Sequence, residues 1–346
     1  MQAFSPAGNL KYVYFGAFSL LFGTFIAGMF FGNSFSPLAG KIISFIGFSF
    51  LLVLVYLFLS FLLIDIVRLI NHFIPFISNI PSFRMWSTIA MIGVITVAMV
   101  IGNIKFNNPQ VKTIEICSTK PSQEKELKIV AASDLHLGIS IDKKRLKKYV
   151  DMINAQNPDI VLFAGDLVDR SIKPVLAQKM DEDLRNIQSK YGVFGVFGNH
   201  EYFGEGVSAI SDFYERSNIT LLRDSFVLLN NELYIIGRND KISPERKSLS
   251  AFTSQLDRTK PMILLDHQPS TLHEAEESGI DFQFSGHTHK GQFFPGNLIV
   301  KKIFEKGYGY LKKGDTHYYI SSGLGIWGPQ YRIGSESELV VVNFRY

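Results

Sequence analysis

Residues 128–136 read KIVAASDLH, a run of strand-forming apolar residues that ends in an acid and a histidine. Apolar runs that end in acidic, amide or histidine side chains return at 159–169 (DIVLFAGDLVD) and at 192–201 (GVFGVFGNHE). Two shorter runs, 262–267 (MILLDH) and 281–289 (DFQFSGHTH), are also followed by histidines. Short apolar strands with polar residues directly after them are typical of α/β proteins, in which ligand groups gather beyond the carboxyl ends of the strands.

Helical patterns separate these strands. Leu146, Val150 and Ile153 recur at helical spacing between the first two strands, and a similar pattern covers residues 176–187 before the third. Strands alternating with amphipathic helices indicate an α/β fold from about residue 103 onward. We expect strands at 128–133, 159–164, 192–197, 233–236, 262–265, 281–284, 317–321 and 338–344.

The first hundred residues have a different composition. Residues 12–31, 42–64 and 85–102 contain no charged side chain. At about 1.5 Å per residue, helices of these lengths cross a hydrocarbon layer of roughly 30 Å, although the third run is at the short limit. The sequence therefore predicts a transmembrane anchor of three helices over residues 1–102 and a catalytic domain over residues 103–346.

Two alternatives stay open for these runs. Any of them could be a buried core helix, and the first could be a cleaved signal peptide, although no small-residue cleavage pattern follows it. Lysines and arginines near the spans are almost equally divided between the two sides, so the positive-inside rule does not assign a membrane face to the catalytic domain.

Charge is nearly balanced outside the anchor. The chain has 346 residues with 35 Lys+Arg and 31 Asp+Glu, and residues 103–346 hold 31 of the basic and 30 of the acidic side chains. This balance argues against a broad basic face, so we expect no nucleic-acid partner. Cys117 is the only cysteine, which excludes an intrachain disulfide and makes a zinc site built from cysteines implausible.

The residues after the strands are donors of the kind that bind metals. Oxygen and imidazole donors without thiolates suit Mn²⁺, our first choice, and also Fe or Zn²⁺. One ion that must also bind water cannot use seven ligands, whereas two ions about 3.5 to 4 Å apart can. Such a pair lowers the pKa of bound water and neutralises phosphate oxygens, which favours phosphoester hydrolysis. The candidate ligands are Asp134, His136, Asp166, Asn199, His267, His287 and His289.

The ordered series DxH, GDxxD, GNHE, H and GHxH resembles the calcineurin-like metallophosphoesterase family over residues 128–345. The resemblance implies a sandwich of two sheets flanked by helices, with Asp166 bridging two metal ions. It implies that the first ion binds Asp134, His136, Asp166 and His289. It implies that the second ion binds Asp166, Asn199, His267 and His287.

The resemblance also implies roles for residues that do not bind metal. It places His200 at the phosphate, as proton donor to the leaving oxygen or as stabiliser of the transition state, with Asp169 orienting its ring. Arg170 falls where some members of the family place an arginine that clamps phosphate, although it could equally be a solvated surface residue.

The stretches at 235–240 (IIGRND), 285–292 (SGHTHKGQ) and 323–334 (GLGIWGPQYRIG) resemble a bacterial branch of the family whose catalytic domain follows membrane helices. Lys290 replaces the glycine usual in that branch, and it could contact an anionic substrate or point to solvent. Trp327 is a candidate for lining the substrate crevice.

The resulting hypothesis is a multi-pass protein of the bacterial inner membrane that hydrolyses a phosphodiester or pyrophosphate with two divalent cations. Its expected partners are the lipid bilayer and a phosphoester substrate. Some members of the resembled family cleave the pyrophosphate of UDP-diacylglucosamine, so that lipid is the first candidate. A phosphomonoesterase or phosphoprotein phosphatase is the alternative enzyme, and a catalytically silent membrane scaffold is the alternative outside enzymes.

Overall fold

The computed structural model describes residues 8–120 and 125–346, and the contacts between them divide the chain into two units. Unit 1 comprises the N-terminal helices up to Ile104 together with residues 328–331. Unit 2 comprises the rest, from Lys105 to Trp327 and from Arg332 to Tyr346. The sequence placed the boundary between residues 102 and 103, and residues 1–7 of the predicted anchor lie outside the described residues.

Three long helices form unit 1. They are α1 (Leu10–Phe31), α2 (Pro37–Phe73) and α3 (Ile80–Asn107), with a short 3₁₀ turn, η1 (Gly32–Ser34), after the first. Each contains the predicted charge-free run and is long and apolar enough to cross a membrane. The helices are longer than the runs, because helical geometry continues into the residues on either side of each run. The 37 residues of α2 span about 55 Å.

Glycines allow α1 and α2 to pack closely. A Cβ at Gly28 would lie 2.8 Å from the Cα of Ser44, and one at Gly47 would collide with the backbone of Phe25. Small residues at such crossings let helix backbones approach, which is the usual way helices associate in lipid. In the same unit, the Tyr331 hydroxyl lies 2.8 Å from the Ser49 hydroxyl.

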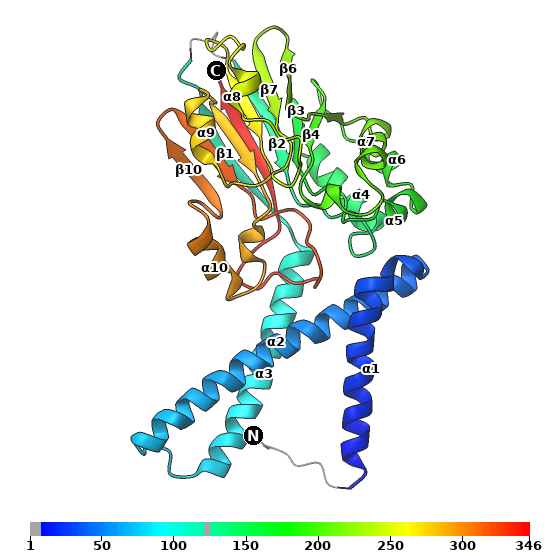
Figure 1. The fold of residues 1–346 in the computed structure, drawn as a ribbon, viewed down its shortest axis with the longest axis vertical. Coiled ribbons are helices and arrows are strands. Elements are labelled where there is room, and N and C mark those ends of the chain that lie inside the picture. The colour runs from blue at the N-terminus through cyan, green and yellow to red at the C-terminus, as the bar shows by residue number, and fades with distance from the viewer. Residues whose placement is uncertain (1–7, 121–124) are drawn as a thin grey trace. The chain divides into compact units, whose positions relative to one another are not determined.

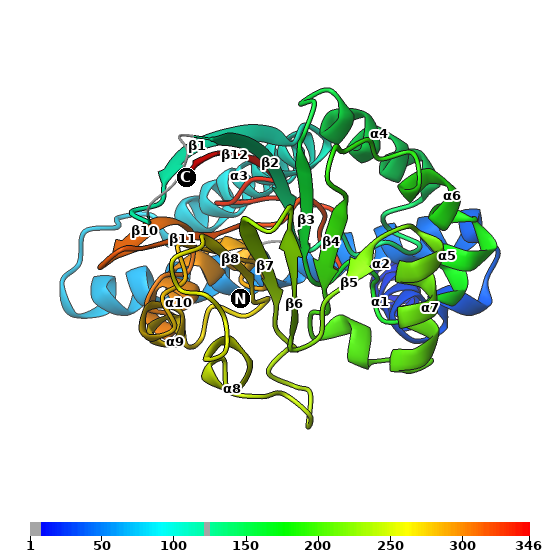
Figure 2. The ribbon, with the colours of Figure 1, turned by 90° about the horizontal axis from the view of Figure 1, so that it is seen from above.

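Unit 2 is built on two six-stranded sheets (Figures 1 and 2). The first has the order β1 (Gln110–Cys117), β12 (Glu338–Arg345), β2 (Glu126–Ala132), β3 (Ile160–Ala164), β4 (Val193–Val196), β5 (Thr220–Leu221). The second has the order β10 (Gly309–Lys313), β11 (Thr316–Ile320), β9 (Phe282–Ser285), β8 (Met262–Leu265), β7 (Leu233–Gly237), β6 (Ser225–Leu229). The expected α/β sandwich of two sheets is confirmed.

Helices cover the outer faces of both sheets (Figure 2). The first sheet packs against α4 (Lys143–Asn154), α5 (Lys173–Ala177), α6 (Met180–Leu184) and α7 (Val207–Arg216), and the second packs against α8 (Ser250–Thr253) and α9 (Leu272–Glu277). A third apolar cluster, which includes Ile129, Leu162, Ile263 and Phe284, fills the space between the sheets. Rigid layers on both sides therefore hold the strand ends in place.

The sequence prediction missed four strands, and they are the four edges of the two sheets. All eight expected strands are present, whereas β1, β5, β6 and β10 were not expected. An edge strand has a solvated side, so it carries the long apolar run of a central strand less often. The helix expected over residues 176–187 is also divided, because Lys179 lies in the left-handed region with φ of 51° and separates α5 from α6.

The strands that precede the candidate ligands run parallel within each sheet. In the first sheet β2, β3 and β4 are parallel neighbours, and in the second β7, β8 and β9 are. Their carboxyl ends therefore meet at a common edge, where the loops after β2, β3, β4, β8 and β9 carry the predicted site.

Candidate active site

The loops after β2 and β9 bring three predicted ligands together. Asp134, His136 and His289 are buried and offer donor atoms that all lie within 4.8 Å of one another. The Nε2 atoms of the two histidines are 3.2 Å apart, and His289 Nε2 is 3.4 Å from Asp134 Oδ1. Two donors each about 2.1 Å from one ion lie roughly 3 Å apart, so these three atoms suit one coordination shell.

A second group of donors surrounds Asp166. His267 Nε2 lies 3.3 Å from Asp166 Oδ2 and 3.3 Å from Asn199 Oδ1. The same amide oxygen lies 2.9 Å from His287 Nδ1. Asp166 Oδ2 is also 3.7 Å from His136 Nε2 of the first group. The structure therefore brings all seven predicted ligands into one cluster, with Asp166 between its two halves.

The electrostatics of the cluster fit bound cations. Asp134 and Asp166 are buried carboxylates, and within the described part of the chain their ion-pair partners are histidines only. Burial raises the pKa of Asp134. Burial acts the same way on Asp166, but the neighbouring His267 outweighs it and holds the pKa of Asp166 well below its usual value. Buried carboxylates that lack a fixed counter-charge are costly, and divalent cations would compensate them.

Backbone strain is concentrated on the predicted ligands. A positive φ is uncommon for residues with a side chain and costs on the order of 1–3 kcal/mol. Such strain persists where the surrounding fold imposes it, and it is frequent at functional sites. Five of the seven ligands have a φ between 48° and 68°, namely Asp134, His136, Asp166, His287 and His289.

Glycines in the same loops make room for the ligands. Gly165 has a φ of 82°, and a Cβ there would lie 2.7 Å from His267 Nδ1. At Gly286, whose φ is ordinary, a Cβ would collide with the carboxylate of Asp134. The fold therefore requires Gly165 for both backbone conformation and space, and Gly286 for space alone.

His200 and Asp169 form a pair beside the cluster. The Nδ1 atom of His200 is 2.9 Å from Asp169 Oδ1, and the main-chain N–H of His200 donates to Asp166 Oδ1 at 2.9 Å. Burial by itself would lower the pKa of His200, but the hydrogen bond to Asp169 and the charge of Asp166 raise it. His200 also offers a donor within 4.8 Å of His136 and Asp166. With Nδ1 held by Asp169, its Nε2 is the atom available to a ligand.

Arg170 and Lys290 occupy different surroundings. Arg170 is exposed, its guanidinium lies 5.8 Å from the centre of the Phe203 ring, and it is not among the residues that line the cavity at the site. Its clamping role stays a prediction. The Lys290 ammonium lies 4.2 Å from the centre of the Tyr308 ring, which is a cation–π contact that the sequence did not anticipate.

A cavity of about 360 Å³ opens over the cluster. Its polar floor consists of Asp166, Asn199, His200, His287 and His289. Its apolar wall consists of Phe293, Val300, Phe304 and Trp327. Val300 lies in helix α10 (Gly296–Ile303), and Phe304 directly follows it. Trp327 was expected at the crevice, whereas the other three wall residues were not. Their signal was the apolar stretch FFPGNLIVKKIF that follows SGHTHKGQ.

Glu201 is a further residue whose importance sequence reasoning missed. Its fully buried carboxylate accepts hydrogen bonds from the main-chain N–H groups of Asp166 at 3.0 Å, Val168 at 2.9 Å and Gly198 at 2.7 Å. It thereby ties the loop after β3 to the loop after β4. The signal was present in the GNHE motif, whose final acid received no role.

Arg332 does the same for the loop at 323–325, where a Cβ at Gly323 would lie 2.9 Å from Asp134 Cβ and 3.3 Å from His289 Nδ1. Its guanidinium is fully buried and donates to the carbonyl oxygens of His289 at 3.2 Å, Gly323 at 3.0 Å and Gly325 at 2.5 Å. Three carbonyls on one guanidinium hold the 323–325 loop against the ligand His289. An arginine within a glycine-rich stretch was the available signal.

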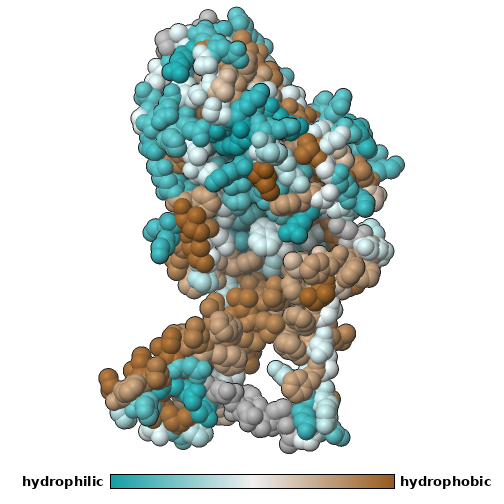
Figure 3. Space-filling view, viewed as in Figure 1, coloured by the Kyte–Doolittle hydropathy of each residue, from teal (hydrophilic) through white to brown (hydrophobic). Residues whose placement is uncertain are grey.

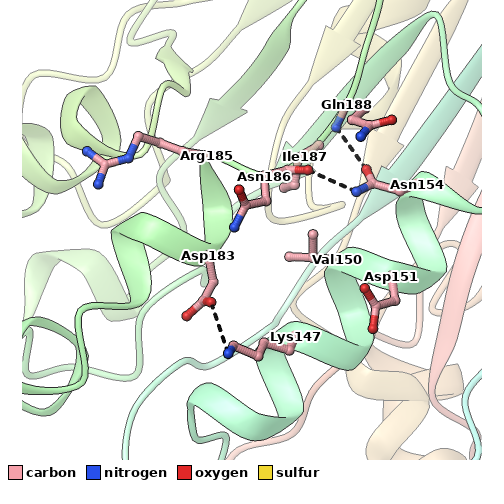
Figure 4. A pocket seen from close by; sticks show the side chains of 9 residues that line it. All are labelled: Lys147, Val150, Asp151, Asn154, Asp183, Arg185, Asn186, Ile187 and Gln188. Carbon is pink, nitrogen blue, oxygen red and sulfur yellow. Dashed lines mark hydrogen bonds and ion pairs between the residues drawn. The ribbon is translucent and has the colours of Figure 1, made fainter.

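A larger cavity, of about 580 Å³, lies between α4 and the segment after α6 (Figure 4). Lys147 faces Asp183 at 3.9 Å, and the Asn154 side chain accepts from the main chain of Gln188 and donates to that of Asn186. Because these polar groups satisfy one another, we assign no activity to this cavity.

Two packed sheets with acid, histidine and asparagine donors for two cations at their strand ends define a metal-dependent phosphoesterase domain. The family model of the calcineurin-like phosphoesterases matches residues 127–291. The chain belongs to the calcineurin-like metallophosphoesterase family.

Curated relatives extend the match beyond that segment. An uncharacterized metallophosphoesterase of Campylobacter jejuni is 34% identical over 249 residues, which cover 70% of this chain and 65% of the relative. One of Aquifex aeolicus is 35% identical over 64% of this chain and 85% of the relative. A Danio rerio protein described as a transmembrane protein with metallophosphoesterase domain is 28% identical over 67% of this chain and 56% of the relative. The chain spans just under two thirds of the length of the first of these.

Proposed function

We propose that this protein is a membrane-anchored phosphoesterase that uses two divalent cations, Mn²⁺ first among them, to hydrolyse a phosphodiester or pyrophosphate bond in an amphiphilic, lipid-linked substrate. We place it in the inner membrane of a bacterium as a multi-pass protein. UDP-diacylglucosamine is the first candidate substrate.

The observation that carries this proposal is the two-sided cavity. The polar floor holds donors for two cations, and the apolar wall stands directly beside it. A substrate that is charged at the reacting phosphorus and apolar next to it would satisfy both sides. The three helices of unit 1, each long and apolar enough to span a membrane, support a substrate that resides in lipid.

The ligand set divides as the cluster does. Asp134, His136 and His289 would hold one cation, and Asn199, His267 and His287 the other, with Asp166 shared. When bound, the two cations would supply a nucleophile from water at neutral pH and neutralise charge on the phosphate oxygens. Glu201 and Arg332 would keep the loops that carry these ligands in place.

His200 would move the proton. Asp169 accepts from its Nδ1, and the raised pKa favours the imidazolium, which carries a second proton on Nε2. That proton can pass to the departing oxygen of the substrate, or it can stay and stabilise the negative charge of the transition state. Both roles need the orientation that Asp169 imposes.

The first test uses the full chain in detergent or nanodiscs with Mn²⁺. We expect faster hydrolysis of bis-p-nitrophenyl phosphate, a diester, than of p-nitrophenyl phosphate, a monoester. The reverse preference would support the phosphomonoesterase alternative. Full metal content without turnover of either compound would support the silent scaffold.

The natural substrate is sought by profiling lipid extracts. Extracts incubated with active protein are compared with extracts incubated with the His200→Ala variant. We expect loss of a lipid-linked diester or pyrophosphate and gain of its phosphate products only with the active protein. UDP-diacylglucosamine added to both reactions tests the first candidate directly, and its survival would remove that candidate.

A further inference from the structure

Exposed apolar side chains of unit 2 are concentrated in one short segment. Within the described residues, nine large apolar side chains of this unit are exposed, and four of the nine fall between residues 294 and 303. The nine are Val111, Phe203, Ile242, Phe294, Leu298, Ile299, Ile303, Tyr310 and Trp327. A concentration of this kind on a domain surface marks an interaction site.

Helix α10 has two apolar sides with different surroundings. Val300 turns into the cavity as part of the apolar wall. Leu298, Ile299 and Ile303 are 56%, 57% and 68% exposed, so they have no partner within the described residues that covers them. Figure 3 shows strongly hydrophobic surface over this helix, bordered by hydrophilic residues. We call Phe294, Leu298, Ile299 and Ile303 the α10 patch.

Positive charge accompanies the α10 patch. Lys301 and Lys302 lie in the helix and Lys306 follows it, and the described residues give none of the three an acidic partner. An apolar helix face flanked by unpaired lysines is the composition of a segment that lies in a membrane interface with anionic lipids. A soluble partner protein would have to bring both an apolar groove and acids to match it.

A membrane crossed by α3 would lie near the start of unit 2, because the connection between them is short. Only Asn108 and Pro109 separate the end of α3 from β1, a tether that reaches about 10 Å. Trp327 of the apolar wall is followed in the chain by residues 328–331, which belong to unit 1. Of the possible occupants of the α10 patch, the bilayer is therefore favoured, because the chain connects unit 2 directly to the candidate membrane spans.

We propose that α10 is an interfacial helix. The α10 patch inserts into the headgroup and upper acyl region of the bilayer, while Lys301, Lys302 and Lys306 contact anionic headgroups. Val300 on the inner side of the same helix belongs to the apolar wall, so an amphiphilic substrate passes from lipid to the polar floor along α10. This consequence rests on the proposed function, whereas the insertion itself does not.

Insertion is tested with spin labels on the full chain. Cys117→Ser removes the only native thiol, and single cysteines are then introduced as Ile299→Cys and Ile303→Cys. Ile242→Cys, at another exposed isoleucine of unit 2, is the matched control. Each labelled protein is reconstituted into vesicles of phosphatidylethanolamine and phosphatidylglycerol, and its accessibility to oxygen and to a water-soluble nickel chelate is measured by electron paramagnetic resonance.

We expect labels at 299 and 303 to favour oxygen over the nickel chelate, with a depth of about 5 to 10 Å, and the label at 242 to favour the chelate. Equal accessibility at 303 and 242 would overturn the proposal. So would a label at 303 that both reagents fail to reach, because that result would mean a second copy or another protein segment covers the α10 patch.

Turnover separates this inference from the proposed function. We expect Ile299→Glu/Ile303→Glu to lower hydrolysis of a vesicle-embedded amphiphilic phosphodiester at least about fivefold and to leave that of bis-p-nitrophenyl phosphate unchanged, since charges oppose insertion. Ile242→Glu should change neither rate. Equal rates of the double variant and wild type on the embedded diester would contradict delivery along α10. If the wild-type protein hydrolysed neither substrate, the proposed function would be contradicted. The depths of the spin labels would still show whether α10 inserts into the bilayer.

Discussion

The polar floor and the apolar wall of the cavity differ in nearly every physical respect. The floor is assembled from loops after strands of both sheets, its backbone is strained at Asp166, His287 and His289, and its side chains are held by hydrogen bonds. The wall comes mainly from one surface segment around α10 and is only partly buried. The floor is therefore expected to determine the reaction, and the wall to determine the substrate.

This comparison predicts two kinds of variant. Changes in the floor should reduce turnover of every phosphoester, because they remove cation ligands or proton transfer. Changes in the wall should reduce only the turnover of amphiphilic substrates, because a small aryl diester has little to gain from it. This division of roles would be contradicted by a wall variant that abolishes all turnover. It would also be contradicted by a floor variant that lowers the turnover of one substrate and not of another.

The largest effect is expected at Asp166. Asp166→Ala removes the carboxylate shared by the two halves of the cluster, so both cations or their pairing should be lost and turnover of bis-p-nitrophenyl phosphate should fall at least about a thousandfold. Metal analysis of the purified protein checks the first point. Asp151→Ala, at an exposed carboxylate of α4, is the control. Normal metal content and rate in the Asp166 variant would contradict the shared role.

His200→Ala should keep the cations and lose proton transfer. We expect kcat to fall about 10² to 10³-fold on all substrates with metal content unchanged. The rate should fall further for substrates with poor leaving groups than for p-nitrophenyl esters, because a more basic leaving oxygen depends more on protonation. If metal is lost in parallel with activity, His200 is a ligand, as its distance from His136 and Asp166 also allows.

Glu201→Gln tests a residue that positions the ligand loops. The amide is the same size, but only one of its two terminal atoms accepts hydrogen bonds, so it cannot replace both Oε1, which accepts from Val168, and Oε2, which accepts from Asp166 and Gly198. We expect the affinity for Mn²⁺ to fall about 10- to 100-fold and excess Mn²⁺ to restore most of kcat. Glu215→Gln, at an exposed glutamate of α7, should behave as wild type. A rate that stays low at saturating Mn²⁺ would argue for a direct part in turnover.

The smallest effect is expected in the wall. Phe304→Ala removes a ring from the apolar side of the cavity, so kcat/KM for an amphiphilic phosphodiester should fall about tenfold, which corresponds to about 1.4 kcal/mol of lost apolar contact. Hydrolysis of bis-p-nitrophenyl phosphate should change less than about twofold. Val111→Ala, at an exposed residue of β1, controls for general destabilisation. If kcat/KM fell equally for both substrates, Phe304 would contribute to the reaction itself, as the floor residues do, and not to substrate selection.

Sequence reasoning succeeded where a local pattern reports burial. The eight central strands are rich in apolar residues, and three of the four edge strands that escaped prediction, β1, β5 and β10, lack an apolar run. The fourth, β6, was missed although its residues 226–229 read FVLL. The seven ligands were found because each directly follows a central strand. Glu201 and Arg332 were missed because they bind main-chain groups of other loops. Main-chain groups are the same in every residue, so the sequence near Glu201 and Arg332 does not indicate these contacts.

The sequence by itself determined that three apolar helices precede an α/β domain with donors for two cations, because length, hydropathy and strand periodicity are local properties of the chain. The tertiary structure decided that the donors of five loops converge, and that the apolar segment after SGHTHKGQ stands beside them as a cavity wall with an exposed outer side. Which segments meet depends on strand order and on packing between residues far apart in the chain, and no window of sequence contains that information.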